Sequence, residues 1–469
     1  MIEGSFMRER KNANNFVAAL LISLMLFFLG CQGKRKNITN VVLITIDTLR
    51  ADHLGCFGYP RNTSPFLDFL AKEGVLFKNA FASSSHTAPS HASVFTSLHP
   101  IQHRLRINGQ DLHNSIYTMA EMFQDLNFNT AGFCSVGFLC RLDKGFDLID
   151  HETYKELVHY RQAHQTMDRA LDFLETKEPS DKFFMWVHLF DPHRPYHPPE
   201  DCQKEMGFKS ESESKAFIHF LNELHKIPRD YYKSQPKLIT DYNNYDAEIL
   251  FVDKQIKRLF QYMEKRDFIS NTLWIITSDH GEGLGNHYYN SHGKYIYREQ
   301  VHVPLLFYFG NKLYSQQNVK KLVRHVDILP TLGTLLDVPF EKNTKFIQGN
   351  PLFPLDKKDK RNPKTYAFYE RRPKDNKARR NWEPGEVYAM QTLKHKYIFH
   401  SRGKDEFYNL LYDPFESRNL IDYEFEEKDN LKEILKLKYD LLSQQTFQHS
   451  REEIDEKYLK ELKALGYIH

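Results

Sequence analysis

Short runs of β-branched and aromatic residues alternate with longer amphipathic stretches along most of this 469-residue chain. Such alternation is typical of βα units, whose strands form a sheet covered by helices. The predicted strands are 41–46, 130–134, 183–189, 272–277 and 303–309. The predicted helices are 64–72, 89–96, 118–124, 160–175, 242–264 and 326–335. We therefore predict an α/β fold with a large, mixed but mostly parallel central sheet flanked by helices.

The second half of the chain changes character after residue 350. Residues 351–381 are rich in Pro, Lys, Arg and Asp and predict a connector with one strand at 365–369. A small antiparallel sheet is then predicted from 387–393, 396–400 and 406–411, followed by helices at 430–445 and 451–465. Residues 204–237 predict a solvated insertion with a helix near 214–225. The predicted division is a signal or anchor (1–31), a spacer (32–40), a catalytic domain (41–350), a C-terminal subdomain (351–425) and a helical tail (426–469).

The N-terminus is typical of an export signal. A basic stretch around Arg8 and Arg10 precedes the apolar run Phe16–Gly30, whose 15 residues are fewer than the roughly 20 of a membrane span. Cys31 follows Leu29-Gly30, as in a bacterial lipoprotein signal that carries lipid on the cysteine. An ordinary signal peptide and an uncleaved anchor are the alternatives. All three predict a protein exported to the bacterial cell envelope, and the first predicts a membrane-anchored lipoprotein on the periplasmic or surface side.

Acidic residues follow three of the predicted strands. Asp47 follows 41–46, Asp191 follows 183–189, and Asp279-His280 follow 272–277. In doubly wound sheets, ligands bind outside the carboxyl ends of the strands. These side chains are therefore predicted to lie close together at one edge of the sheet.

Thr87 is one of three hydroxyls, with Ser85 and Ser90, that could act at that edge. It lies just before Pro89, which favours the first turn of a helix. The N-terminus of a helix offers N–H groups and a positive dipole end to an anion. Ser85 and Ser90 are competing hydroxyls, and the non-catalytic alternative for Thr87 is a helix cap.

Asp47, Thr87, Asp279 and His280 together form a ligand set for one divalent metal ion. Mixed oxygen and nitrogen ligands suit Zn or Mn at least as well as Ca. A metal beside a hydroxyl is an arrangement that cleaves charged esters. The formal net charge of +3 argues against nucleic acid as a partner.

A series of motifs in fixed order resembles the sulfatase family of the alkaline-phosphatase-like superfamily, from about residue 40 to about 420. The motifs are Asp47–Tyr59, Thr63–Asp68, Glu73–Phe77, Asp191–Tyr196, Asp279–Gly285, His292–Lys294 with Val303–Leu305, and Leu411–Glu416 with Asn419-Leu420. The resemblance implies an alkaline-phosphatase-like fold with a small C-terminal sheet. It also implies a hydrolase of sulfuric or phosphoric esters.

The chain departs from the family at its centre. Sulfatases usually carry Cys or Ser, oxidised to formylglycine, where Thr87 stands, followed by x-Pro-x-Arg; here the fifth residue is His91. Threonine cannot form that aldehyde. The usual Asp-Asp pair is Asp47-Thr48, and calcium sulfatases usually have Asn where His280 stands, which favours a transition metal. We predict a Thr-nucleophile variant, as in phosphodiesterase and phosphotransferase branches of the superfamily.

The resemblance also implies roles around the nucleophile. His193 is expected near the leaving group, and Lys294, assisted by His292, against the oxygens of the anion. Asn108 is expected to bind a non-bridging oxygen or else to form a turn. His91 either fills the space of the missing arginine or only packs. A less favoured prediction is a second metal ion at Asp191, His193 and His197.

Three functions are compatible with these residues. The leading one is an exported, metal-dependent hydrolase that cleaves a sulfate or phosphate/phosphonate ester through Thr87. One alternative is a phosphotransferase, similar to phosphoethanolamine transferases, that acts on an envelope lipid or glycan. The other is an inactive glycan-binding surface lipoprotein, against which the intact ligand set argues. An ester on Thr87 lacks the exit that an aldehyde provides, which favours phosphate or phosphonate over sulfate.

Overall fold

The computed structural model describes residues 38–150, 160–225, 231, 234–338, 347–355, 366–374 and 385–447. All of them fall within one compact unit of the chain, Ile38–His469. The predicted signal with Cys31, most of the spacer and the predicted helix at 451–465 lie outside the described residues. Among the helices that are described, none is both long and apolar enough to cross a membrane.

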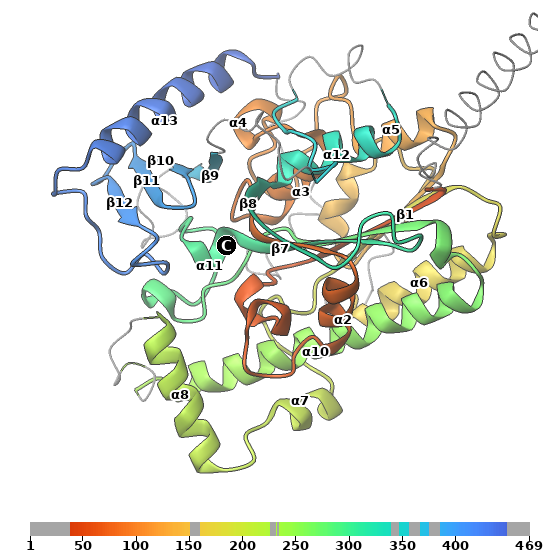
Figure 1. Cartoon of the computed structure of the whole chain (residues 1–469), viewed down its shortest axis with the longest axis horizontal. Helices are drawn as coiled ribbons and strands as arrows, with labels where there is room; N and C mark the ends of the chain where they lie inside the picture. The colour runs from red at the N-terminus through yellow and green to blue at the C-terminus, as the bar shows by residue number, and fades with distance from the viewer. Residues whose placement is uncertain are drawn as a thin grey trace, which may run out of the picture. The chain divides into compact units, whose positions relative to one another are not determined.

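A central eight-stranded sheet organises this unit (Figure 1). Its strands are β1 (Asn40–Ile46), β2 (Val75–Phe81), β3 (Asn129–Cys134), β4 (Leu148–Asp150), β5 (Phe183–Leu189), β6 (Thr272–Ser278), β7 (His302–Phe309) and β8 (Gln317–Arg324). The strand order is β4-β3-β5-β1-β6-β7-β2-β8. β7 pairs antiparallel with β6 and β2, and the other pairs are parallel. The predicted mixed, mostly parallel sheet is confirmed.

Helices cover both faces of the sheet. Alternate residues of β1 point to opposite faces, so Ile44 and Ile46 pack on one core and Val41 and Leu43 on the other. The first core contains α2 (Pro65–Glu73), α6 (Ala163–Glu175) and α10 (Pro236–Lys265). The second contains α3 (Thr87–Thr96), α5 (Met119–Asp125) and α12 (Ile328–Leu335). Because both faces are covered, the central strands are buried along their length and mostly apolar.

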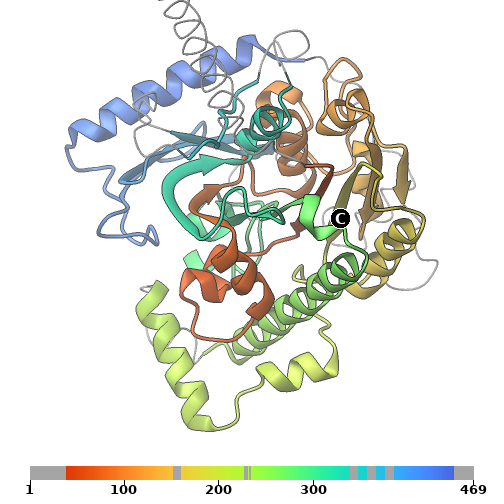
Figure 2. The same cartoon turned by 45° about the vertical axis from the view of Figure 1, so that its right-hand side comes forward.

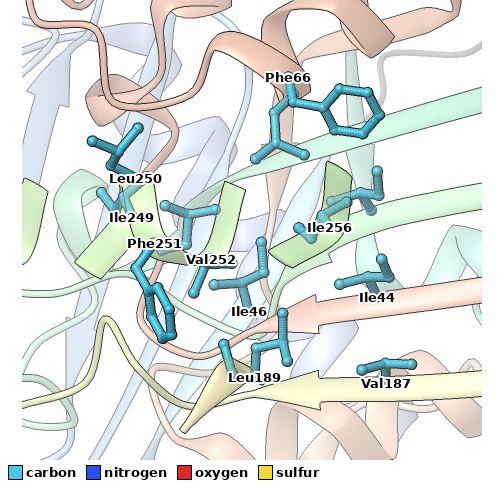
Figure 3. Close-up of a cluster of buried hydrophobic side chains, with 14 of the residues drawn as sticks. Ile44, Ile46, Phe66, Val187, Leu189, Ile249, Leu250, Phe251, Val252 and Ile256 are labelled. Carbon is cyan, nitrogen blue, oxygen red and sulfur yellow. The ribbon is translucent and has the colours of Figure 1, made fainter. Parts of the chain in front are cut away.

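The core beneath α10 fixes the ends of β1 and β5 (Figure 3). Side chains from the two strands meet α10 and α2 there: Ile44, Ile46, Val187, Leu189, Phe66, Ile249, Leu250, Phe251, Val252 and Ile256. Burial of each large aliphatic side chain contributes about 1.5–3 kcal/mol. This packing holds in place the strand ends from which Asp47 and Asp191 follow.

Three strands of the central sheet were not predicted. β8 is an edge strand whose exposed positions include Lys320, so it lacks the apolar run that marks a buried strand. β2 is interrupted by a register shift between Phe77 and Ala80. β4 has only three residues.

The segment 204–237 is more than a solvated insertion. It contains the end of α7 (Glu200–Met206) and then α8 (Glu211–His225), close to the predicted helix. Phe217 and Leu221 of α8 are buried in the core. The Arg61 guanidinium lies 5.0 Å from the ring centre of Phe217. The predicted helix is present and much of the described segment is exposed, but one apolar face of α8 packs on the core, so the segment is not only a solvated excursion.

The predicted small antiparallel sheet is confirmed after residue 366 (Figure 2). It consists of β9 (Ala367–Lys374), β10 (Gly385–Gln391), β11 (His395–His400) and β12 (Glu406–Asn409), in the order β12-β11-β10-β9. α13 (Glu426–Gln444) packs on it through Leu431 and Leu435. A bridge between Ser84 and Glu370 connects the start of β9 to the segment before α3.

Candidate active site

Two neighbouring parallel strands bring the acidic residues together. Ile46 of β1 is in register with Ser278 of β6, so Asp47 and Asp279 follow side by side. Ligand atoms of Asp47, Asp279 and His280 all lie within 4.8 Å of one another, and all three side chains are fully buried. Within the part of the chain that the structure describes, no other group of three or more His, Cys, Asp or Glu meets this spacing.

The backbone orients each of these side chains. Asp279 Oδ1 accepts hydrogen bonds from the backbone N–H groups of Thr48 (3.2 Å) and His280 (2.8 Å). Its other oxygen, Oδ2, is therefore the one that can bind a metal ion. His280 Nδ1 lies 2.9 Å from the Gly281 carbonyl, which can only accept, so Nδ1 carries the proton. The lone pair of Nε2 therefore faces the group, 3.4 Å from Asp279 Oδ2 and 3.9 Å from Asp47 Oδ1.

This centre fits a divalent cation. Neither Asp47 oxygen, nor Asp279 Oδ2, has a partner with normal hydrogen-bond geometry among the described residues, although all three are buried. Burial and the neighbouring Asp279 carboxylate raise the pKa of Asp47 well above its ordinary value; the Thr87 hydroxyl is close enough to Asp47 to lower its pKa slightly against these effects. Burial would also raise the pKa of Asp279, but the imidazoles around it hold that pKa below its ordinary value. A cation satisfies the unpartnered oxygens and removes the repulsion between the two carboxylates.

Thr87 is the hydroxyl beside this group. It is the first residue of α3 and is fully buried, with Oγ1 3.3 Å from His280 Nε2. The competing hydroxyl of Ser90 is engaged elsewhere, because it donates to the Asp279 carbonyl (2.6 Å) and lies 3.1 Å from His325 Nδ1. The predicted nucleophile and the three predicted metal ligands are thus in one place.

His91 lies beneath Thr87 in a chain of hydrogen bonds. Trp186 Nε1 donates to Thr45 Oγ1 (3.0 Å), which lies 2.9 Å from His91 Nε2. His91 Nδ1 donates to the Thr87 carbonyl (2.9 Å). Burial lowers the pKa of His91 to about 4, so the ring is neutral at pH 7. Both ring nitrogens of His91 therefore bind protein groups below the nucleophile.

Asn108 lies at the N-terminus of α3. Its Oδ1 accepts a hydrogen bond from the backbone N–H of Ala88 (2.9 Å), and the side chain is buried. Its Nδ2 is buried without a hydrogen-bond partner among the described residues. One end of this amide thus caps the helix, and the other is a donor next to Thr87.

Two further histidines line the same site. The ring of His292 lies 4.5 Å from the ring of His280 and 4.9 Å from that of His193. His292 Nδ1 is 3.3 Å from Glu282 Oε1. His193 stacks on Phe190, and its Nδ1 donates to the Arg194 carbonyl. Burial, followed by the neighbouring His292, lowers the pKa of His193 well below its ordinary value.

Lys294 lies against an aromatic ring, whereas Asp191 is a buried carboxyl group that binds the backbone. Lys294 stands two residues after His292 in the chain. Its ammonium group lies 4.7 Å from the ring centre of Tyr295. Asp191 Oδ1 accepts from the Ala163 N–H, and burial raises the pKa of Asp191 to about 7. His197 is exposed, and Asp191, His193 and His197 do not form a metal-ligand group within the described ranges. The predicted second metal ion has no ligand cluster there.

Two residues of the site were missed. Glu282 stands in a predicted motif but received no role, although it contacts His292. His188, on β5, lies 3.5 Å through Nε2 from Asp47 Oδ2. The signal for His188 was its place as the one imidazole in the otherwise apolar strand 183–189.

Comparison with known proteins identifies the class. The sulfatase family model matches residues 39–338, and the model of the C-terminal region of N-sulphoglucosamine sulphohydrolase matches residues 285–445. The uncharacterized sulfatase YidJ of Escherichia coli is 27% identical over 413 residues, covering 77% of this chain and 79% of that protein. N-acetylglucosamine-6-O-sulfatase of Bacteroides thetaiotaomicron is 23% identical, with 76% and 78% covered.

Solved structures show the same fold. The phosphonate monoester hydrolase of Agrobacterium radiobacter superposes with a TM-score of 0.67 at 20% identity, covering 89% of this chain and 98% of that one. A protein in complex with its substrate D-glucosamine-2-N,6-O-disulfate gives a TM-score of 0.69 at 21% identity, with 90% and 100% covered. The fold is that of the alkaline-phosphatase-like hydrolases. The chain belongs to the sulfatase family and is an ester hydrolase of that family.

Proposed function

We propose that this protein is an exported, metal-dependent hydrolase that cleaves a sulfate or phosphate/phosphonate ester with Thr87 as the nucleophile. The observation that carries the proposal is the position of Thr87 Oγ1, 3.3 Å from His280 Nε2 at the start of α3. A hydroxyl, a cation-binding group and the positive end of a helix then meet at one buried point. We keep phosphate and phosphonate esters as the favoured substrates.

Asp47, Asp279 and His280, together with the Thr87 oxygen, would hold the metal, which would stabilise negative charge on the ester and lower the pKa of the Thr87 hydroxyl. The Thr87 hydroxyl loses its proton to solvent, and Oγ1 forms the bond to phosphorus or sulfur as the bond to the leaving oxygen breaks and that oxygen takes a proton from His193. Water then attacks the ester on Thr87: its oxygen bonds to phosphorus or sulfur, one of its protons returns to Thr87 Oγ1, and the other passes to His193 or solvent. His91 keeps Thr87 in place from below by its bond to the Thr87 carbonyl.

His193 is the proposed proton donor to the leaving oxygen. In the free protein its Nδ1–H is bound by the Arg194 carbonyl and its pKa is lowered, so Nε2 lacks a proton. An anionic ester next to the ring favours the charged imidazole and raises that pKa. Substrate binding thus favours protonated His193, which can then donate its proton to the leaving oxygen. Lys294, His292 and the Nδ2 of Asn108 are proposed to contact the anion.

The class of substrate is supported by the neighbours and by the nucleophile. One solved neighbour holds a sulfated glucosamine, another is in complex with neocarrahexaose, and a third is a phosphonate monoester hydrolase. We therefore propose that the substrate is a glycan that carries the sulfate or phosphate group as an ester. An ester on Thr87 must be cleaved by direct attack of water, and phosphoryl esters beside a metal allow this attack at phosphorus.

A panel of esters tests the proposal. The full chain, stripped by a chelator and reloaded with Ca²⁺, Mn²⁺ or Zn²⁺, is assayed with aryl sulfate, phosphate monoester, phosphodiester and phosphonate monoester substrates. We expect turnover of phosphonate or phosphate esters, and higher turnover with Mn²⁺ or Zn²⁺ than with Ca²⁺. Arylsulfatase activity without phosphoesterase activity would overturn the preferred substrate. Transfer of the phosphoryl group to an added alcohol in place of water would favour the phosphotransferase.

Export and lipid attachment are proposed from the N-terminal pattern. If Cys31 carries lipid, the full-length protein partitions into the detergent phase when expressed in a bacterium, and Cys31→Ser blocks processing or releases the protein. The measurement is phase partitioning with immunoblotting. Unchanged partitioning of the variant, with unchanged mass, would identify the apolar run 16–30 as an uncleaved anchor.

A further inference from the structure

His188 lies against the proposed metal centre on the side of β5. It is in register with Thr45 of β1, so its ring stands beside the strand end from which Asp47 follows. The side chain is fully buried, and its Nε2 is 3.5 Å from Asp47 Oδ2. The ring of His91 meets it edge-on at 5.1 Å.

The hydrogen-bonding groups of His188 and Asp47 share one property. Among the described residues, neither ring nitrogen of His188 and neither oxygen of Asp47 has a partner with normal hydrogen-bond geometry, although the Thr87 hydroxyl is close enough to Asp47 to act on its pKa. The neighbouring imidazoles differ, since His91 uses both of its nitrogens and His280 uses Nδ1. A buried polar group without a partner costs about 1–3 kcal/mol. Two such groups facing each other across 3.5 Å indicate that they act together when the centre is loaded.

Geometry distinguishes two ways in which His188 can act. Two ligands of one ion are at most about 4.4 Å apart, twice a metal–ligand bond of about 2.2 Å. His280 Nε2 lies 3.4 Å from Asp279 Oδ2 and 3.9 Å from Asp47 Oδ1, both within this limit, and His188 does not join their group. Direct binding to the same ion therefore fits poorly. Donation from Nε2–H to Asp47 requires only that the 3.5 Å separation shorten by about half an ångström.

We propose that His188 is a positioning residue of the metal centre, whose Nε2–H donates to Asp47 Oδ2 and directs the other carboxylate oxygen to the ion. The inference rests on the proposed function. Hydrogen bonds to a ligating carboxylate fix its orientation, and their loss typically weakens metal binding or activity by about 10- to 100-fold. A neutral imidazole supplies this bond without placing a second positive charge beside the cation.

Metal affinity of two variants tests the role. His188→Phe removes the donor and keeps a ring, and His188→Gln keeps an N–H donor. Each full-length protein is stripped and titrated with Zn²⁺ and Mn²⁺ in competition with a chromogenic chelator. We expect His188→Phe to bind about 10- to 100-fold more weakly, and His188→Gln to keep most of the wild-type affinity. The stripped Phe variant should unfold at the wild-type temperature or above, because it no longer buries an unpartnered imidazole.

A matched control and a spectrum complete the design. His99→Phe changes another fully buried imidazole, at the start of α4 (Pro100–His103) and 5.0 Å from the ring of Phe368, and should leave the affinity unchanged. The absorption bands of the Co²⁺-loaded protein should have the same positions in wild type and His188→Phe, because no ligand is lost.

The outcomes separate this inference from the proposed function. Wild-type affinity in His188→Phe would overturn the inference alone. Equal losses in the Phe and Gln variants, together with shifted Co²⁺ bands, would make His188 a ligand and overturn the positioning role. A wild-type protein that binds neither metal would contradict the proposed metal centre itself.

Discussion

Thr87 sets the chemical limits of this site at the scale of single residues. The Thr87 hydroxyl lies 3.3 Å from His280 Nε2. The backbone carbonyl of Thr87 accepts a hydrogen bond from His91, which holds the residue in place. A secondary alcohol cannot form the hydrated aldehyde of the formylglycine enzymes. If Thr87 attacks as proposed, the resulting ester needs a second nucleophile to be cleaved, and this requirement would decide which anions the protein can process.

Replacement of Thr87 tests the nucleophile directly. Thr87→Ala should lower kcat/KM by about 10³-fold or more, because the covalent route is lost, while the far-UV circular dichroism stays unchanged. Thr87→Ser keeps a hydroxyl and should retain part of the activity. Full activity in the alanine variant would make water the nucleophile and Thr87 a structural residue at the start of α3.

Replacement of Asp279 should lower the metal content of the protein and its activity together. Its Oδ1 is held by two backbone N–H groups, so Asp279→Asn changes the charge at Oδ2 with little change in shape. Metal per chain, measured by elemental analysis after dialysis, and turnover should fall together. A variant that keeps the metal and loses activity would show that Asp279 acts on the substrate instead.

At the scale of elements, α10 fixes the start of α2 on one face of the central sheet. Asp253 of α10 accepts hydrogen bonds from the backbone N–H groups of Phe66 (3.0 Å) and Leu67 (2.7 Å) in the first turn of α2. The carboxyl group is buried, and burial raises its pKa to about 7. A helix start is thus capped by a residue about 190 positions later in the chain.

This carboxyl group should make stability depend on pH. Its pKa is near 3.9 in the unfolded chain and about 7 in the folded protein, so the folded state binds the proton more tightly. Its contribution is full below about pH 4 and is lost as pH rises through about 7. Asp253→Asn should therefore flatten the decline of unfolding free energy between pH 4.5 and 8.

Chemical denaturation across that pH range measures the effect. Asp191, whose pKa is also raised to about 7, adds a similar slope, so the variant should lose only part of the decline. Asp172→Asn removes an exposed carboxylate, with a side chain 61% exposed, and should keep the wild-type slope. An unchanged slope in Asp253→Asn would mean that the carboxylate is charged in the folded protein.

At the scale of the whole molecule, a buried ion pair joins the small sheet to the segment that follows Lys294. Lys396 of β11 contacts both carboxylate oxygens of Glu416, at 2.9 and 2.8 Å, and donates to the Ile296 carbonyl (2.7 Å). Glu416 in turn accepts from the backbone N–H of Arg298. These bonds connect β11 to the segment that follows Lys294.

Lys396→Met should destabilise the protein by about 3–5 kcal/mol, because it leaves the Glu416 charge buried and unpaired. Thermal or urea unfolding measures the loss. The matched surface pair Lys404–Asp422 is exposed, and Lys404→Met should change stability by no more than about 1 kcal/mol. A loss in Lys396→Met as small as in this control would show that the pair does not hold the small sheet in place.

The sequence by itself determined the local elements and the chemical types at their ends. Apolar period and β-branched content predicted β1, β3, β5, β6 and β7 within one or two residues, because these strands are buried on both faces. The acids after β1 and β6 were identified from their position at the strand ends, and the resemblance to the sulfatase family selected Thr87, the first residue of α3, among the neighbouring hydroxyls. The domain boundaries stay predictions.

Only the tertiary structure decided which distant groups meet. The pairing of β1 with β5 places His188 beside Asp47, and the packing of α10 places Asp253 at the start of α2. The edge strand β8 forms because β2 offers it backbone partners. Strand order, register and helix docking result from the summed packing of many side chains. The spacing of hydrophobic residues predicts which face of a helix or strand is buried, but it does not predict which other element packs on that face.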